Sequence, residues 1–151
     1  MAQDNKHIAQ RWFDEVWNQG RESSIDELLS PEGVGFGLAE ADTEVHGPAQ
    51  FKPFARNMRN AFPDFHIKIE DMLAEGDKVA VRFQVTGTHK GDGLGFPATG
   101  NKIDLTGITI IQFAAGKLVH GWNNWDQLGM LRQLNVSPAG VRIDQFLETR
   151  A

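Results

Sequence analysis

One segment near the C-terminal end of the sequence gathers side chains that could do chemistry. His120, Trp122, Asn124 and Asp126 alternate there along the chain. In a β-strand alternate residues point to one face of the sheet, so these four side chains are predicted to converge on one cavity. A carboxylate beside an amide, an indole and an imidazole could accept a proton from a bound molecule and hold its polar groups.

Asp126 has a second interpretation, because it stands directly before a predicted short helix. An aspartate at this position often caps a helix N-terminus, and the cap contributes about 1 kcal/mol. The two roles are compatible, and the sequence leaves both open.

Three other candidates lie outside this segment. Arg82 belongs to a strand whose opposite face is apolar; it is either an exposed, ion-paired residue or a pocket cation that orients a carbonyl or pairs with Asp126. His46 and His89 stand at strand–loop junctions beside glycine or threonine. Single histidines are more often structural than functional, and each is retained only as a candidate for substrate binding.

Metal and phosphate sites are not expected. The five histidines lack the close spacing of zinc ligands. The glycine-rich stretch from Gly91 to Gly95 is followed by Phe96-Pro97 and a strand, whereas a phosphate-binding loop needs a helix N-terminus there. This stretch is predicted to be a hairpin loop, and no cofactor is expected.

Hydrophobic periodicity predicts the elements that would position these residues. Helices are expected near residues 4–20, 24–31, 48–62 and 127–134, and strands near 33–45, 65–70, 79–86, 103–113 and 117–125. The last four strands are joined by short links, which favours antiparallel neighbours. The order predicts an α+β domain with helices on one face of a curved sheet.

The amino-acid composition excludes several classes of function. The 151 residues suit one domain, predicted over 1–136 with a C-terminal tail at 137–151. A net charge of −5 argues against a nucleic-acid partner. Without cysteine or tyrosine, thiolate and phenol chemistry are excluded. No apolar run could cross a membrane and no signal peptide is visible, so a cytoplasmic location is expected.

Several short segments, read together, are similar to a known family. In chain order they are His46-Gly47-Pro48, Ala61-Phe62-Pro63-Asp64, Gly76-Asp77-Lys78-Val79-Ala80-Val81-Arg82, Gly87-Thr88-His89, Ala98-Thr99-Gly100 and Trp122-Asn123-Asn124-Trp125-Asp126-Gln127-Leu128-Gly129. Their order and spacing resemble those of the SnoaL-like polyketide cyclases, a branch of the nuclear-transport-factor-like superfamily. The resemblance extends roughly from Ile8 to Val136.

The resemblance implies a fold and an activity. The fold is a conical barrel of a strongly curved antiparallel sheet wrapped around helices, with an apolar pocket at its open end. The activity is aldol ring closure of a hydrophobic, polyketide-like substrate without a cofactor, with Asp126 as general base. Substrate-binding roles would fall to Trp122, Asn124, Arg82, His46, His89 and His120. A homodimer or higher homo-oligomer, formed through the outer sheet face, is also implied.

The sequence departs from the family near this motif. Such cyclases commonly carry acidic and histidine residues just before the tryptophan and an acid just after it, where this chain has His120, Gly121 and Asn123. Two alternatives therefore stand. One is a non-catalytic small-molecule-binding or assembly domain. The other is an epoxide-hydrolase-like enzyme that uses Arg82 and Asp126, which the missing tyrosine disfavours.

Overall fold

The computed structural model describes residues 2–39 and 42–136, and the predicted tail lies outside this part. Its helical segments are α1 (Ala2–Arg11), the π-helix η1 (Trp12–Asn18), α2 (Glu22–Leu28), α3 (Gly47–Ala61) and α4 (Gln127–Gln133). Its strands are β1 (Leu29–Phe36), β2 (Glu44–His46), β3 (His66–Glu75), β4 (Lys78–Thr88), β5 (Lys102–Ala114) and β6 (Lys117–Trp125). None of these helices is long and apolar enough to cross a membrane.

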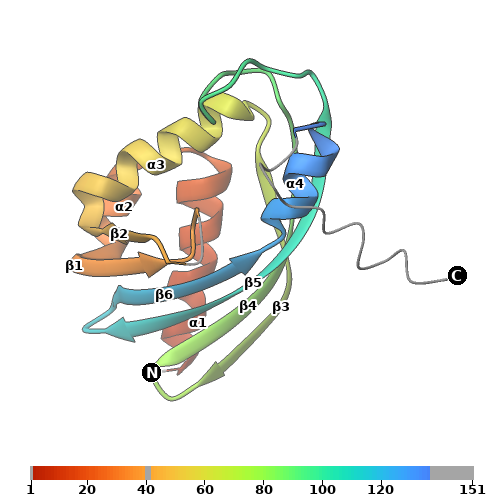
Figure 1. Ribbon diagram of the computed structural model, residues 1–151. Coiled ribbons are helices and arrows are strands. Elements are labelled where there is room, and N and C mark those ends of the chain that lie inside the picture. Colours follow the sequence, from red (N-terminus) through yellow and green to blue (C-terminus); the bar gives the residue numbers. More distant parts are fainter. Residues whose placement is uncertain (1, 40–41, 137–151) are drawn as a thin grey trace, which may run out of the picture.

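The six strands form one curved sheet in the order β2-β1-β6-β5-β4-β3. Figure 1 shows this sheet bending around the helices, with α4 beyond the end of β6. The α+β prediction is confirmed, with three corrections. The predicted strand at 33–45 is two strands, and β1 runs parallel to β6, so the sheet is not wholly antiparallel. β2 and β3 are the free edges, so the sheet does not close into a barrel.

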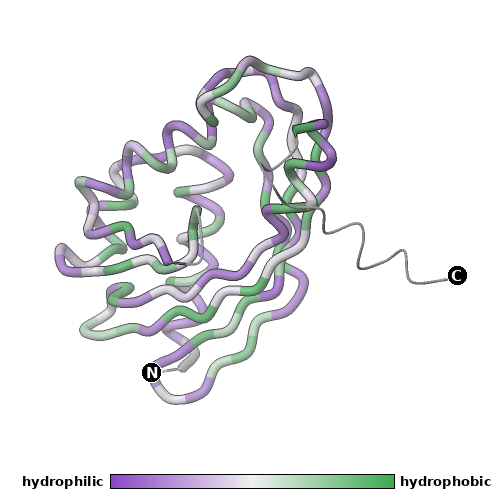
Figure 2. Tube along the Cα trace, in the orientation of Figure 1, coloured by the Kyte–Doolittle hydropathy of each residue, from purple (hydrophilic) through white to green (hydrophobic). Residues whose placement is uncertain are grey.

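Alternation along the strands directs the core to the concave face. Figure 2 shows hydrophobic and hydrophilic positions alternating along the central strands and along α3. On β4 the buried residues include Val81 and Phe83, while Arg82 between them is exposed. Gly107 on β5 stands between Phe83 and Trp125, and a Cβ there would lie 2.6 Å from the Phe83 ring. Glycine at this position therefore gives two aromatic side chains room over the concave face.

The first predicted helix continues as a π-helix over η1. In an α-helix, residues five apart differ by about 140° around the axis. In a π-helix, backbone bonds join residues five apart, so such residues lie one turn apart on the same face. This brings Trp12 and Trp17 onto the buried side of η1 together.

The end of η1 is fastened to a strand and to a neighbouring helix. The Asn18 side chain accepts a hydrogen bond from the Ile67 backbone N–H (2.7 Å) and donates one to the Ile67 carbonyl (2.9 Å), which pairs it with the free edge of β3. The Arg59 guanidinium of α3 donates to the carbonyls of Trp17 and Asn18. These bonds use backbone groups at the helix end and at the sheet edge that would otherwise lack partners.

An ionic cluster fastens η1 to α2. Glu15 accepts hydrogen bonds from Arg11 Nε (2.7 Å) and from the Ser24 hydroxyl (2.6 Å). The Arg11 guanidinium, helped by Ser24, lowers the pKa of Glu15 to about 2. Glu15 is therefore ionised at neutral pH, and its carboxylate helps to fix the helix that carries Trp12 and Trp17.

Candidate functional site

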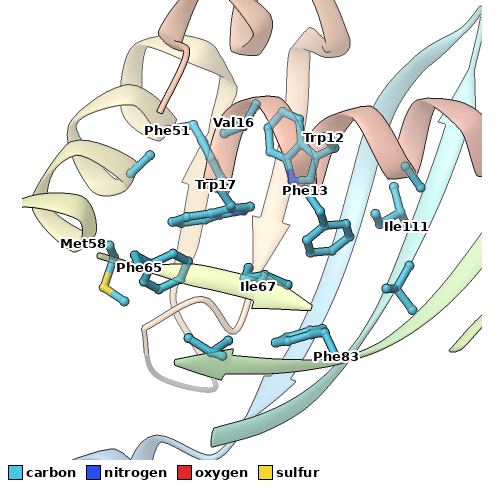
Figure 3. Packing of buried hydrophobic residues seen from close by; sticks show 14 of the residues in the cluster. Trp12, Phe13, Val16, Trp17, Phe51, Met58, Phe65, Ile67, Phe83 and Ile111 are labelled. Carbon is cyan, nitrogen blue, oxygen red and sulfur yellow. The ribbon is translucent and has the colours of Figure 1, made fainter. Parts of the chain in front are cut away.

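A cavity lies between the concave face of the sheet and the helices η1 and α3. Its lining comes from several elements and is mostly apolar with a few polar groups, as in many small-molecule sites. Most lining side chains are aromatic or aliphatic, and they include Trp12, Phe13, Trp17, Phe51, Phe83 and Trp125. Figure 3 shows Trp17 and Phe13 of η1 lying over Ile67 and Phe83 of the strands, whereas Trp12 packs against Phe51 of α3.

A small polar cluster interrupts this apolar lining on the sheet side. The Thr109 hydroxyl lies 2.8 Å from Asn123 Oδ1, and Asn123 Nδ2 donates to the Phe36 carbonyl at 2.9 Å. Trp125 Nε1 donates to the Leu38 carbonyl at 2.9 Å. These bonds tie the end of β1 and the residues after it to β6. No carboxylate lines the cavity in the part of the chain that the structure describes.

The predicted convergence of the β6 side chains on the cavity is wrong. Gln112 of β5 pairs with His120 and Phe113 pairs with Leu118, so Val119 is an extra residue that forms a β-bulge. Beyond the bulge, Gly121, Asn123 and Trp125 line the cavity. Trp122 and Asn124 therefore face the opposite, outer side of the sheet, where both are exposed.

Asp126 is exposed and caps α4. Its Oδ1 accepts a hydrogen bond from the Gly129 backbone N–H at 2.8 Å, and it is not among the residues that line the cavity. The helix-cap interpretation is thus confirmed. In this position the carboxylate stands in solvent beyond the end of β6, so the apolar environment expected to raise the basicity of a general base is missing.

Arg82 is an exposed, ion-paired residue of the outer sheet face. Its guanidinium Nη2 lies 2.6 Å from Asp71 Oδ2 on the neighbouring strand β3. The predicted pocket cation is therefore wrong, because Arg82 points away from the cavity. An epoxide-hydrolase arrangement of Arg82 with Asp126 around one water has no basis in this geometry.

His46 and His89 are also placed away from the cavity. His46 is exposed, with Nε2 2.9 Å from the Glu44 carboxylate. His89 is fully buried, and its Nδ1 accepts a hydrogen bond from the Thr99 backbone N–H at 3.1 Å. It therefore fastens the glycine-rich loop that follows β4, in agreement with the structural interpretation of a single histidine.

His120 borders the cavity, but its ring lies on the outer face of the sheet. There Nδ1 is 3.0 Å from Gln112 Oε1, and the ring stacks near Phe36 and Trp122. Of the seven predicted site residues, His120 alone borders the cavity. Within the described residues no cluster of side chains could hold a metal ion.

The cavity residues that sequence reasoning passed over are Trp12, Trp17, Thr109, Gly121 and Asn123. The two tryptophans are largely buried, so their apolar helical spacing indicates core residues more readily than a site. The inward position of Gly121 and Asn123 depends on one extra residue in β6; Gly121 inside the strand is a weak signal of a bulge that does not set its position.

Comparison with known proteins gives a consistent result. The family model of the SnoaL-like polyketide cyclases matches residues 7–134. The aklanonic acid methyl ester cyclase DnrD of Streptomyces peucetius is 29% identical over 122 residues, which cover 80% of this chain and 83% of DnrD.

Two solved structures share the fold over 91% of the chain. One, from Jannaschia sp. CCS1, is described as a SnoaL-like polyketide cyclase and superposes with a TM-score of 0.82 at 25% identity over 95% of its own chain. The other, AclR of Streptomyces galilaeus, is described as a hydroxylase and superposes with a TM-score of 0.78 at 28% identity over its full length.

Proposed function

Since the chain belongs to the SnoaL-like polyketide cyclase family, we propose that its cavity binds a hydrophobic, polyketide-like molecule and promotes ring closure. The observation that carries this proposal is the apolar, aromatic-lined cavity between η1, α3 and the sheet. Such a cavity binds a ligand by removing apolar surface from water. Hydrogen-bond donors among its lining side chains would orient a ligand that carries several oxygens.

The proposed reaction is an intramolecular aldol addition. A carbon between two carbonyl groups loses a proton and becomes an enolate carbon. This carbon bonds to the carbon of another carbonyl group farther along the same molecule, and the new alkoxide takes up a proton. Substrate and product are isomers, and no electron-transfer cofactor is required. The cavity would contribute by holding the two reacting carbons together and by stabilising the enolate, while water at the open mouth accepts the proton.

A second version of this function keeps Asp126 as the general base. The family motif supports it, while the exposure of the carboxylate and its bond to Gly129 oppose it. Asp126→Asn separates the two versions, because asparagine caps a helix about as well as aspartate. We expect this variant to retain turnover of aklanonic acid methyl ester within about twofold, measured by chromatography of the isomeric product.

The matched control is Asp126→Ala, which removes the cap. We expect it to lower the free energy of unfolding by about 1 kcal/mol, again with turnover retained. A loss of turnover of more than about a hundredfold in Asp126→Asn, with an unchanged unfolding midpoint, would establish Asp126 as the base.

A non-catalytic binding protein of the same fold is the second candidate function. One observation favours it: the described residues place no carboxylate in the cavity. One ligand followed in both a binding assay and a turnover assay distinguishes ring closure from simple binding. A ligand that binds with micromolar affinity and is recovered unchanged would favour the binding function.

We also propose that the protein forms a homodimer through the outer face of its sheet. A row of side chains crosses that face from strand to strand, made of Phe36, Trp122, Ile110, Ala80 and Leu73. Trp122 is 39%, Ile110 41% and Leu73 71% exposed. A contiguous apolar row on a sheet face is unfavourable in water, and a second copy related by twofold symmetry would cover it.

Ile110→Glu places a charge in the middle of this row. We expect the variant to be monomeric in analytical ultracentrifugation at a concentration where the wild type is dimeric, because the charge would be buried without a partner. Thr106→Glu, which adds the same charge on the same face of β5 nearer its start, is the control and is expected to remain dimeric. A dimer that persists in Ile110→Glu, or a monomeric wild type, contradicts the proposed interface.

A further inference from the structure

Two tryptophans of η1 present hydrogen-bond donors that the described chain leaves unused. Trp12 and Trp17 are each 6% exposed and line the cavity. Neither indole N–H has an acceptor among residues 2–39 and 42–136. Among the described residues, His89 Nε2 is the side-chain nitrogen or oxygen that is fully buried without a hydrogen-bond partner. Since the two indole nitrogens also lack a partner, they are not fully buried. Each N–H therefore keeps some surface that the described residues do not cover, on a ring that borders the cavity.

The π-helix and one phenylalanine fix the two indoles relative to each other. Residues five apart share a face of η1, so both rings project into the same space. The Trp12 and Trp17 rings both pack against Phe51 of α3, with centroids 4.9 Å and 5.7 Å away. Trp17 also packs against Phe65 at 5.3 Å. Figure 3 shows this arrangement, in which rigid packing would hold the donors in place before a ligand arrives.

The other polar groups of the cavity are already committed. The indole N–H of Trp125 donates to the Leu38 carbonyl, and the Asn123 amide donates to the carbonyls of Phe36 and Gly121. The Thr109 hydroxyl is bonded to the same asparagine or to the Trp122 carbonyl. Trp12 and Trp17 are thus the spare donors of the described lining, on the side opposite this polar cluster.

We propose that the indole N–H groups of Trp12 and Trp17 form an oxygen-binding subsite for a 1,3-dicarbonyl group. The donors are neutral and no lysine or arginine lines the cavity within the described residues, so a carboxylate or phosphate would lose its hydration without a fixed positive charge to compensate. A carbonyl oxygen is weakly hydrated, and it gains negative charge when the carbon between two carbonyls loses its proton. Fixed N–H donors stabilise that enolate oxygen. This inference rests on the proposed function, because it requires the cavity to be the ligand site.

The experiment compares two ligands of similar shape in isothermal titration calorimetry. Benzoylacetone carries a 1,3-dicarbonyl group next to a phenyl ring, while butylbenzene lacks both oxygens. The variants are Trp12→Phe, Trp17→Phe and the double variant, in which phenylalanine keeps an apolar ring but removes the donor. Trp122→Phe, on the outer sheet face, is the control.

We expect each cavity variant to weaken benzoylacetone binding by about tenfold, and the double variant by more, while butylbenzene binding changes by less than about threefold. Equal losses for both ligands would mean that the tryptophans contribute only packing, and unchanged benzoylacetone binding in the double variant would mean that they donate to no ligand oxygen. Either result overturns the subsite but leaves the cavity as the ligand site. If neither ligand binds the wild type, the proposed function fails together with the subsite.

Discussion

Replacing Gly121 with phenylalanine is expected to abolish ligand binding and turnover while the protein stays folded. Gly121 lines the cavity, and a Cβ built there meets only Asn123 Nδ2 at 3.7 Å, so a larger side chain would extend into open space. A phenyl ring in that space excludes the ligand by overlap, which ordinary rearrangement cannot relieve in a packed interior. We expect at least about a hundredfold loss of benzoylacetone affinity by calorimetry.

Gly121→Ala is the graded control for this experiment. One methyl group removes little of the cavity, and we expect affinity within about threefold of the wild type. Thermal unfolding of both variants checks that the fold is intact. Full affinity in a folded Gly121→Phe variant would show that ligands bind elsewhere on the protein.

Replacing Asn18 with alanine is expected to have the largest effect on stability among the residues that position the cavity. The substitution removes two hydrogen bonds to Ile67, at 2.7 and 2.9 Å, and leaves a backbone N–H and C=O at the edge of β3 without partners. We expect the free energy of unfolding to fall by about 2–3 kcal/mol, measured by urea denaturation.

The same substitution should also weaken ligand binding, because Asn18 follows Trp17 directly and fixes the end of the π-helix. Gln19→Ala is the matched control, since Gln19 is exposed and, among the described residues, its side chain bonds only to Arg21 on the surface. We expect Gln19→Ala to change stability by less than about 0.5 kcal/mol. Equal losses in the two variants would mean that the bonds to Ile67 contribute nothing.

The order of helices and strands is largely predictable from this sequence because its periodicity is strong. Phe51, Ala55 and Met58 form a helical stripe, and Val79, Val81 and Phe83 alternate as a half-buried strand should. The parallel pairing of β1 with β6 was not predictable in the same way. These strands are far apart in the chain, and β1 contains Pro31 and two glycines that obscure its pattern.

The direction of the β6 side chains could not be predicted for a physical reason. A shift of one residue turns every side chain of a strand to the opposite face, and the bulge at Val119 causes such a shift. The neighbouring strand offers no better indication at this level, because the middle of β5 is apolar on both faces. Ile108 and Ile110 are exposed outside, while Leu105 and Ile111 are buried inside.

The π-helix could not be predicted from the sequence either. The spacing of Trp12, Phe13, Val16 and Trp17 is compatible with an α-helical stripe, so periodicity alone does not distinguish the two helices. The end of the π-helix is held by contacts from distant parts of the chain, namely Arg59 and the edge of β3 at Ile67. For this reason the spacing of these cavity-lining residues indicates core and does not mark a site.

The four tryptophans allow one spectrum to test whether the cavity, and not the β6 motif, binds the ligand. In a ¹H–¹⁵N correlation spectrum each indole N–H gives its own signal, which single Trp→Phe variants assign. On titration with benzoylacetone we expect the signals of Trp12 and Trp17 to move and that of Trp122 to stay. Movement of Trp122 and of the Asn124 side-chain amide, with Trp12 and Trp17 unchanged, would contradict the cavity as the ligand site.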